Sequence, residues 1–155
     1  MAQSWHDLLF AHWPVPSKEL RAGIPASLEI DTYDGQAWLG IVPFRMSGVR
    51  FRGIPALPGL SAFPELNIRT YVTAGGKPGV FFFSLEAANP IAVRAARYWY
   101  HLPYRHARMA CRAEGDGIAY TSQRTYWRAS PAAFVGQYRP IGGCWSRRGN
   151  RWRIG

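Results

Sequence analysis

Three pairs of extended segments, each joined by a short glycine-containing turn, constrain this chain more than any other feature of its sequence. The paired segments are residues 28–33 and 36–42, 66–73 and 80–85, and 105–113 and 118–127. Asp34-Gly35, between the first two segments, gives the strongest hairpin signal because this dipeptide favours the tight turns that join antiparallel strands. The pattern predicts an antiparallel sheet or barrel rather than a doubly wound fold.

Helical signals lie between and around these pairs. Asn89-Pro90 supplies an N-cap residue followed by a proline in the first turn, and apolar residues then recur at helical spacing up to about His101. A capping-box pattern that starts at Ser4 predicts a short helix ending near Pro14. Brief helical stretches are also predicted over residues 17–22 and 130–137.

A long segment rich in glycine, proline and arginine, residues 43–64, is predicted to be an ordered loop. Loops of this length inside a compact domain tend to carry function. With 155 residues, of which 48% are hydrophobic, the chain has enough apolar material for one packed domain. The predicted fold class is α+β, with an antiparallel, β-rich, barrel-like sheet and a few helices.

Membrane insertion and secretion are not expected. No apolar run approaches the roughly 20 residues that span a bilayer, and the first ten residues, which include Asp7, do not resemble a secretory signal. We therefore expect a cytoplasmic protein. Cys111 and Cys144 lie far apart without a CxxC spacing, so both are interpreted as free thiols.

The net charge of +10 raises the possibility of nucleic-acid binding. Four of the 19 basic residues lie in residues 144–155 without any acid, so the rest of the chain has 19 − 4 = 15 basic against 9 acidic residues, or +6. The remaining arginines are scattered, and no known nucleic-acid-binding motif appears. A basic interaction protein that binds nucleic acid is kept as an alternative, but we do not expect it.

Metal and phosphate sites also lack support in the sequence. His101, Tyr104 and His106 cluster after the long predicted helix, without the additional ligands of a known metal motif. The glycine-rich residues 75–79 resemble a phosphate loop in composition only, because Pro78 follows the lysine where such a loop needs serine or threonine. No metal and no cofactor are predicted.

Several long motifs, rich in tryptophan and proline, resemble the YqjF-like family of bacterial proteins, a domain of unknown function. They lie at residues 4–16, 34–40, 42–46, 57–72, 82–87 and 103–104. The resemblance covers about residues 3–143, so residues 1–143 are expected to form the YqjF-like domain. It also implies a fold similar to that of acetoacetate decarboxylase.

That decarboxylase acts through an activated lysine that forms a Schiff base. The present chain has only Lys18 and Lys77, one in a polar stretch and one in a glycine-proline turn, and neither position would desolvate the amine. The segment that resembles the lysine-bearing strand end reads Ser84-Leu85-Glu86 instead. We therefore predict that acetoacetate decarboxylase activity is absent.

A candidate pocket follows from the spacing of polar residues on one predicted strand. Glu65 and Arg69 are four residues apart with Asn67 between them, so their side chains share one face of the strand. That face either lines a pocket or is solvated, and the resemblance favours the pocket because Glu65 resembles the decarboxylase's pocket carboxylate. Arginines in the lining favour an anionic, carboxylate-bearing ligand.

The sequence therefore predicts a small-molecule-binding domain without Schiff-base chemistry. The predicted ligand-binding residues are Glu65, Arg69, Arg45 and Ser84. The alternative is a lyase or decarboxylase-like enzyme that uses Glu65 or Glu86 as its general acid or base, which would require a raised carboxylate pKa.

The last twelve residues, 144–155, form a separate unit in this interpretation. They are heavy in arginine, tryptophan and glycine and show no hydrophobic periodicity, and the resemblance ends before them. We interpret them as a non-homologous tail of a truncated or frameshifted product, which would leave the fold incomplete at its C-terminus. A natural, solvated basic tail is the alternative.

Overall fold

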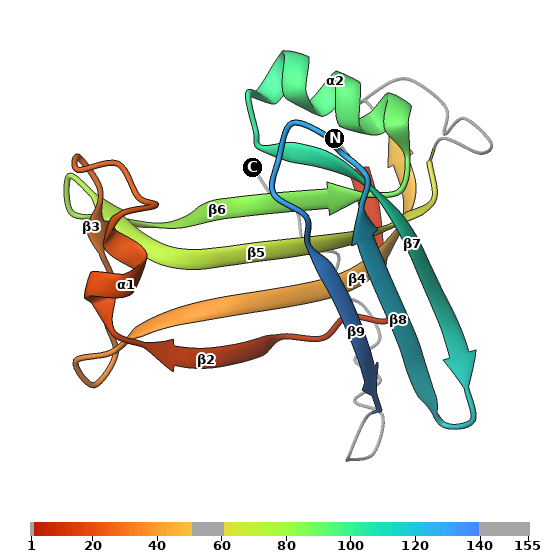
Figure 1. Cartoon of the computed structure of the whole chain (residues 1–155), viewed down its shortest axis with the longest axis horizontal. Helices are drawn as coiled ribbons and strands as arrows, with labels where there is room; N and C mark the ends of the chain where they lie inside the picture. Colours follow the sequence, from red (N-terminus) through yellow and green to blue (C-terminus); the bar gives the residue numbers. More distant parts are fainter. Residues whose placement is uncertain (1, 51–60, 140–155) are drawn as a thin grey trace.

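A computed structural model of the chain describes residues 2–50 and 61–139 and shows one curled sheet with two short helical elements on it (Figure 1). The elements are β1 (Ala2–His6), β2 (Ala11–Val15), α1 (Ser17–Arg21), β3 (Glu29–Ile30), β4 (Ala37–Arg50), β5 (Phe63–Ala74), β6 (Lys77–Ala87), α2 (Pro90–Tyr100), β7 (Tyr104–Glu114), β8 (Gly117–Arg124) and β9 (Ala133–Tyr138). The predicted α+β class with an antiparallel, barrel-like sheet is confirmed. The predicted tail, residues 144–155 with Cys144, lies outside the described residues.

The strand order is β1-β4-β5-β6-β7-β8-β9, with β2 also paired to β4 and β3 to β5. In Figure 1, β2, β4, β5 and β6 run across the view, and β7, β8 and β9 descend steeply at one end of them. The hydroxyl of Tyr138 on β9 donates a hydrogen bond to the backbone oxygen of Asp7, 2.5 Å away, just after β1. This bond joins the last described strand to the turn that follows the first.

Two of the three predicted hairpins are confirmed. β5 and β6 are joined by Gly75 and Gly76, whose φ angles of 55° and 75° suit a tight hairpin turn. β7 and β8 are joined by a two-residue turn that contains Gly115 at φ 59°. The Asp34-Gly35 turn also forms, but the strand before it, β3, pairs with β5 and not with β4, so the first predicted hairpin pairing is wrong.

Two predicted helices are strands. The segment that starts at Ser4 forms β1 and β2, which pair with β4 on either side of a turn at Asp7, where φ is 53°. Pairing with β4 overrides the local capping signal because it packs the side chain of Trp5 against the buried Phe44, with 4.9 Å between ring centroids. The segment 130–137 forms most of β9, which pairs with β8.

The predicted loop over 43–64 is also wrong where the chain is described, because β4 continues through Pro43 and β5 begins before the segment ends. The carbonyl of Pro43 accepts a hydrogen bond of 3.1 Å from the amide of Leu9, on the side of β4 away from β5. The nitrogen of Pro43 faces the same side, so its missing N–H removes no hydrogen bond to β5. A proline is tolerated where its nitrogen faces away from the ladder, and here it falls in the gap between the pairings of β1 and β2. Residues 51–60 lie outside the described residues.

The predicted helices at 17–22 and 89–101 are confirmed as α1 and α2. Asn89 caps α2, since its side-chain oxygen accepts the amides of Ile91 and Ala92 at 3.0 and 3.1 Å. α2 then leads to β7, which pairs in parallel with β6. The pairing begins with Leu85 opposite Tyr104. The sheet therefore contains one parallel pairing that the sequence pattern did not reveal.

Two apolar clusters lie on opposite faces of the sheet. One contains Val42, Phe44, Met46, Phe63, Ala87 and Val93, and α2 covers it. The other contains Leu20, Ile24, Ala37 and Val72 and lies under α1. α1 and α2 lie at opposite ends of the sheet (Figure 1). Within the part of the chain that is described, no helix has the length and apolar character required to cross a membrane.

Candidate functional site

The polar row predicted on one strand lies on β5. The register with β4 places Glu65, Asn67 and Arg69 opposite Phe44, Val42 and Gly40, so all three share the face that carries the cluster under α2. Only 3% of Glu65 and 5% of Asn67 is exposed. The alternative of a solvated face therefore does not hold for these two residues.

Glu65 is a buried carboxyl group, and no cationic side chain among the described residues pairs with it. The hydroxyl of Tyr104 donates to both of its carboxyl oxygens, at 3.2 and 3.1 Å. Burial raises the pKa of Glu65 to about 8, although the hydrogen bond from Tyr104 opposes part of this rise. The same burial, together with the neighbouring Glu65, raises the pKa of the Tyr104 phenol. Glu65 is therefore largely protonated at neutral pH and has a proton to donate.

Both carboxylate oxygens of Glu86, the second predicted acid, already have hydrogen-bond partners. It projects from the opposite face of the sheet, where Arg124 bonds its Oε1 atom at 2.6 Å and the hydroxyl of Ser122 donates to its Oε2 atom at 2.8 Å. Ser84 lies beside this pair and accepts hydrogen bonds from Arg105 at 3.2 Å and from Arg124 at 3.3 Å. Glu86 therefore serves as the counterion of a buried arginine.

The two predicted arginines lie apart from this group. Arg45 forms an ion pair with Asp7, with 3.0 Å between Nη2 and Oδ2, so its charge is already matched. The guanidinium of Arg69 lies over the rings of Phe10 and Tyr71, at 5.2 and 5.9 Å from their centroids. The structure does not gather the predicted ligand-binding residues into one site.

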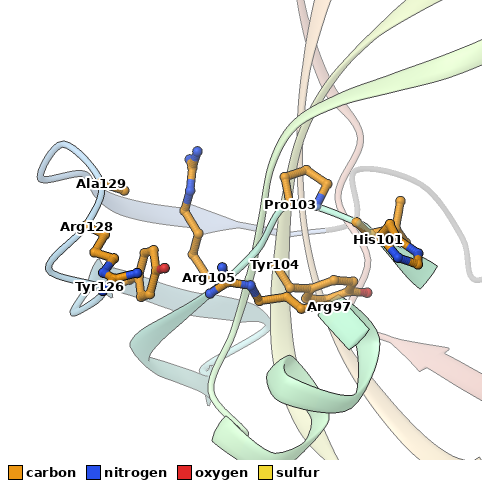
Figure 2. A pocket seen from close by; sticks show the side chains of 9 residues that line it. Arg97, His101, Pro103, Tyr104, Arg105, Tyr126, Arg128 and Ala129 are labelled. Carbon is orange, nitrogen blue, oxygen red and sulfur yellow. The ribbon is translucent and has the colours of Figure 1, made fainter. Parts of the chain in front are cut away.

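A cavity of about 430 Å³ opens between the end of α2, the start of β7 and the segment after β8 (Figure 2). Its lining residues are Arg97, His101, Leu102, Pro103, Tyr104, Arg105, Tyr126, Arg128 and Ala129. Three arginines and a histidine are among these described lining residues, and no acidic residue is. We call it the basic cavity.

The wall of the basic cavity touches the buried residues that the sequence predicted. Tyr104 lines the cavity and holds Glu65, and Arg105 lines it and donates to Ser84. Burial is the main cause that lowers the pKa of Arg105, the neighbouring charges of Arg124 and Arg97 add to it, and the carboxylate of Glu86 opposes it.

Sequence reasoning missed the arginines of this cavity. Arg97 lies on α2, Arg105 on β7 and Arg128 in the segment between β8 and β9, and their only local signal was the polar cluster around His101 and Tyr104. In that cluster, His106 bonds the hydroxyl of Thr125 at 2.6 Å instead of turning to the cavity. The described residues include no group of three or more His, Cys, Asp or Glu side chains that could hold a metal ion.

Comparisons with known proteins agree with this fold. The model of the family DUF2071, described as an uncharacterised conserved protein, matches residues 2–150. Over 141 residues the chain is 52% identical to the uncharacterised protein YqjF of Bacillus subtilis (strain 168), covering 91% of this chain and 57% of that protein.

Three solved structures share the fold at low sequence identity. The acetoacetate decarboxylase of Legionella pneumophila matches with a TM-score of 0.54 at 13% identity, over 81% of this chain and 51% of the enzyme. An acetoacetate decarboxylase-like enzyme from Sphingomonas wittichii RW1 gives 0.60 at 15%, over 79% and 52%. The enduracididine biosynthesis enzyme MppR, complexed with pyruvate, gives 0.56 at 12%, over 81% and 52%. The chain thus spans about half the length of the relatives that it matches.

Proposed function

The chain belongs to the DUF2071 family of uncharacterised conserved proteins, and from this premise we propose that it binds a small anionic ligand of the carboxylate type in the basic cavity, without Schiff-base chemistry. The observation that carries the proposal is the charge of the lining, in which three arginines and His101 face one cavity without an acid. Guanidinium groups bind carboxylates through paired hydrogen bonds, so such a lining suits a carboxylate ligand.

The surroundings of the cavity support this proposal. Among the described residues, the one acid bonded beside these arginines is Glu86, and Arg124 and Ser122 already occupy both of its oxygens. Arg105 has only the neutral hydroxyl of Ser84 as its hydrogen-bond partner among the interactions described. Guanidinium charges gathered around one acid favour the entry of an anion, which would relieve their mutual repulsion.

The fold supports the class of ligand without identifying it. MppR has been solved in complex with pyruvate, a small carboxylate, and its fold is shared at 12% identity. We therefore take pyruvate as the probe for the basic cavity.

Replacement of Arg97 and Arg128 by glutamine is expected to weaken pyruvate binding about tenfold or more, because each loses a charge-assisted hydrogen bond to the carboxylate. Both side chains are exposed, so the fold should not change. Isothermal titration calorimetry measures the Kd. Arg108→Gln is the matched control, since Arg108 is exposed on β7 and does not line the cavity.

Pyruvamide, the neutral analogue of pyruvate, should bind much more weakly than pyruvate to the unaltered protein. Equal affinity for pyruvate and pyruvamide, or an equal loss of affinity in Arg108→Gln, would overturn the proposal.

No Schiff base is expected to form with a keto acid. Lys18 and Lys77 are both exposed, and neither lines the basic cavity, so neither amine has the desolvated surroundings that activate a lysine. Borohydride reduction in the presence of acetoacetate or pyruvate should yield no adduct by mass spectrometry. An adduct on Lys18 or Lys77 that forms faster than on free lysine would contradict the prediction.

A lyase or decarboxylase-like activity is the second candidate, and the protonated state of Glu65 favours it. A carboxyl group with a pKa of about 8 can act as a general acid near neutral pH, and Tyr104 links it to the basic cavity. If the protein is an enzyme of this kind, turnover of a panel of 2-oxo acids should fall as the pH rises through 8. Glu65→Gln should abolish that turnover, whereas turnover that survives in Glu65→Gln would remove Glu65 from the mechanism.

A further inference from the structure

A second cavity, of about 560 Å³, lies at the end of the sheet far from α2, where the turn before β4 meets β2 and β5. Its lining residues are His12, Asp31, Thr32, Tyr33, Trp38 and Tyr71. Four of the six have aromatic rings, one is a carboxylate, and none is a lysine or arginine. This lining, which we call the aromatic cavity, is opposite in charge to that of the basic cavity.

Local structure holds two of these residues in place. Asp34 and Gly35 both have positive φ angles, 52° and 73°, and Tyr33 and Gln36 exchange backbone hydrogen bonds of 2.9 and 3.1 Å across this tight turn. The amide of Asp31 donates to the carbonyl of Tyr71 on β5 at 3.0 Å. The turn therefore keeps Asp31 and Tyr33 beside the sheet.

The histidine of the lining is also fixed. His12 bonds the hydroxyl of Tyr71 through Nε2 at 2.8 Å and stacks on that ring with 5.8 Å between centroids. It lies directly over Gly40, where an added Cβ atom would come within 2.9 Å of Nε2. The glycine therefore permits the close approach that places the imidazole in the wall.

The exposure of Tyr33 points to a ligand. Tyr33 is 70% exposed, although backbone hydrogen bonds across the turn hold its main chain at the cavity. A tyrosine side chain has only two rotatable bonds before its ring plane is set, so it presents a large contact surface and loses little conformational entropy on binding. The faces of aromatic rings carry negative potential, and the carboxylate of Asp31 adds a negative charge beside them.

We propose that the aromatic cavity binds an organic cation of the quaternary or methylated ammonium class. Tyr33 and Trp38 would supply ring faces and Asp31 the counter-charge. Arg69 already places a guanidinium over Tyr71 and Phe10 from outside the lining, so neighbouring rings of the same sheet accept a cation. Because the guanidinium of Arg69 already covers the ring of Tyr71, we assign the ligand cation to the rings of Tyr33 and Trp38.

Choline and its neutral isostere, 3,3-dimethylbutan-1-ol, form a probe pair of matched shape. Titration followed by NMR should show a saturable shift of the tryptophan indole signals with choline and a much weaker response to the alcohol. Equal binding of the two probes, or no saturable shift with choline, would overturn the proposal.

Two exposed residues allow matched variants that spare the fold. Asp31→Asn and Tyr33→Leu should each weaken choline binding about two- to fivefold, as expected for one charge or one ring face at a partly exposed site. Asp116→Asn is the control for charge and Tyr98→Leu the control for an exposed ring, and both should bind choline like the unaltered protein. An equal loss in the controls would overturn the assignment. Arg97→Gln with Arg128→Gln should leave choline binding unchanged, so this site and the basic cavity are tested separately.

Discussion

Replacement of Glu86 by glutamine is expected to lower the free energy of unfolding by about 3–5 kcal/mol. The ion pair between Glu86 and Arg124 is almost completely buried, with 2% and 7% of the side chains exposed. Glutamine preserves the volume but leaves the charge of Arg124 buried without a counterion. Urea denaturation followed by circular dichroism gives the loss as a shift in the midpoint.

Asp116→Asn supplies the matched control, because Asp116 pairs with Arg139 at the surface, where 75% and 65% of their side chains are exposed. Its cost should stay below about 1 kcal/mol. The double variant Glu86→Gln with Arg124→Met should recover part of the stability, since it removes the unmatched charge. If Glu86→Gln costs no more than Asp116→Asn, the buried pair does not stabilise the fold as we infer.

Replacement of Glu65 by glutamine is expected to stabilise the protein above pH 7 and to flatten the dependence of its stability on pH. The pKa of Glu65 is about 8 in the folded protein, against an ordinary value of 4.5. Between these values the unfolded chain releases the proton and the folded chain keeps it, so unfolding becomes easier as the pH rises. The expected slope is about 1.4 kcal/mol per pH unit for this one proton.

The stability that protonated Glu65 contributes is fully present below pH 4.5 and is lost as the pH rises through 8. Glutamine is neutral at every pH and can still accept the hydrogen bond of Tyr104. The pH-dependent contribution of residue 65 to the free energy of unfolding should therefore vanish in Glu65→Gln. Urea titrations at several pH values from 5 to 9 measure it as the difference between the two proteins. Glu29→Gln, an exposed change on β3, should retain the unaltered slope. Identical slopes in the unaltered protein and Glu65→Gln would refute the raised pKa.

Local signals in the sequence were enough for the features that a few consecutive residues encode. Gly75-Gly76 and Gly115 specify turns through their positive φ angles, and Asn89 specifies the start of α2 through its side-chain cap. These elements were predicted because their hydrogen bonds close within two to four residues. The Asp34-Gly35 turn forms for the same reason, because its hydrogen bonds are local. The predicted pairing of the strands on either side of it was wrong, because β3 pairs with the distant β5.

Long-range pairing decided the elements that were wrong. Ser4 lies opposite Ser47 in β4, and no pattern within the first fifteen residues reveals that partner. A capping-box pattern competes poorly with a ladder of backbone bonds to a strand on which Trp5 also packs against Phe44. Pro43 lies in a strand and not in the predicted loop. The gap between β1 and β2 that accommodates it exists only in the folded sheet, so the sequence does not reveal it.

The candidate site was predictable only in its buried part. Spacing on one strand placed Glu65 and Asn67 on a common face, and both are buried there. The arginines of the basic cavity meet because β6 and β7 pair in parallel after α2, which brings Arg97 and Arg105 toward Arg128. A register of that kind depends on the whole sheet, so residue spacing alone did not indicate it.

The hydrogen bond from Tyr138 to the backbone of Asp7 has a consequence for the order in which the chain assembles. It joins residues 131 positions apart, whereas two-residue turns connect β5 with β6 and β7 with β8. Contacts between distant positions lose the most chain entropy on closure, so they form after the nearby ones. The molecule is therefore expected to fold from its middle hairpins outward, and the segment around Asp7 to dock last, on strands that are already in place.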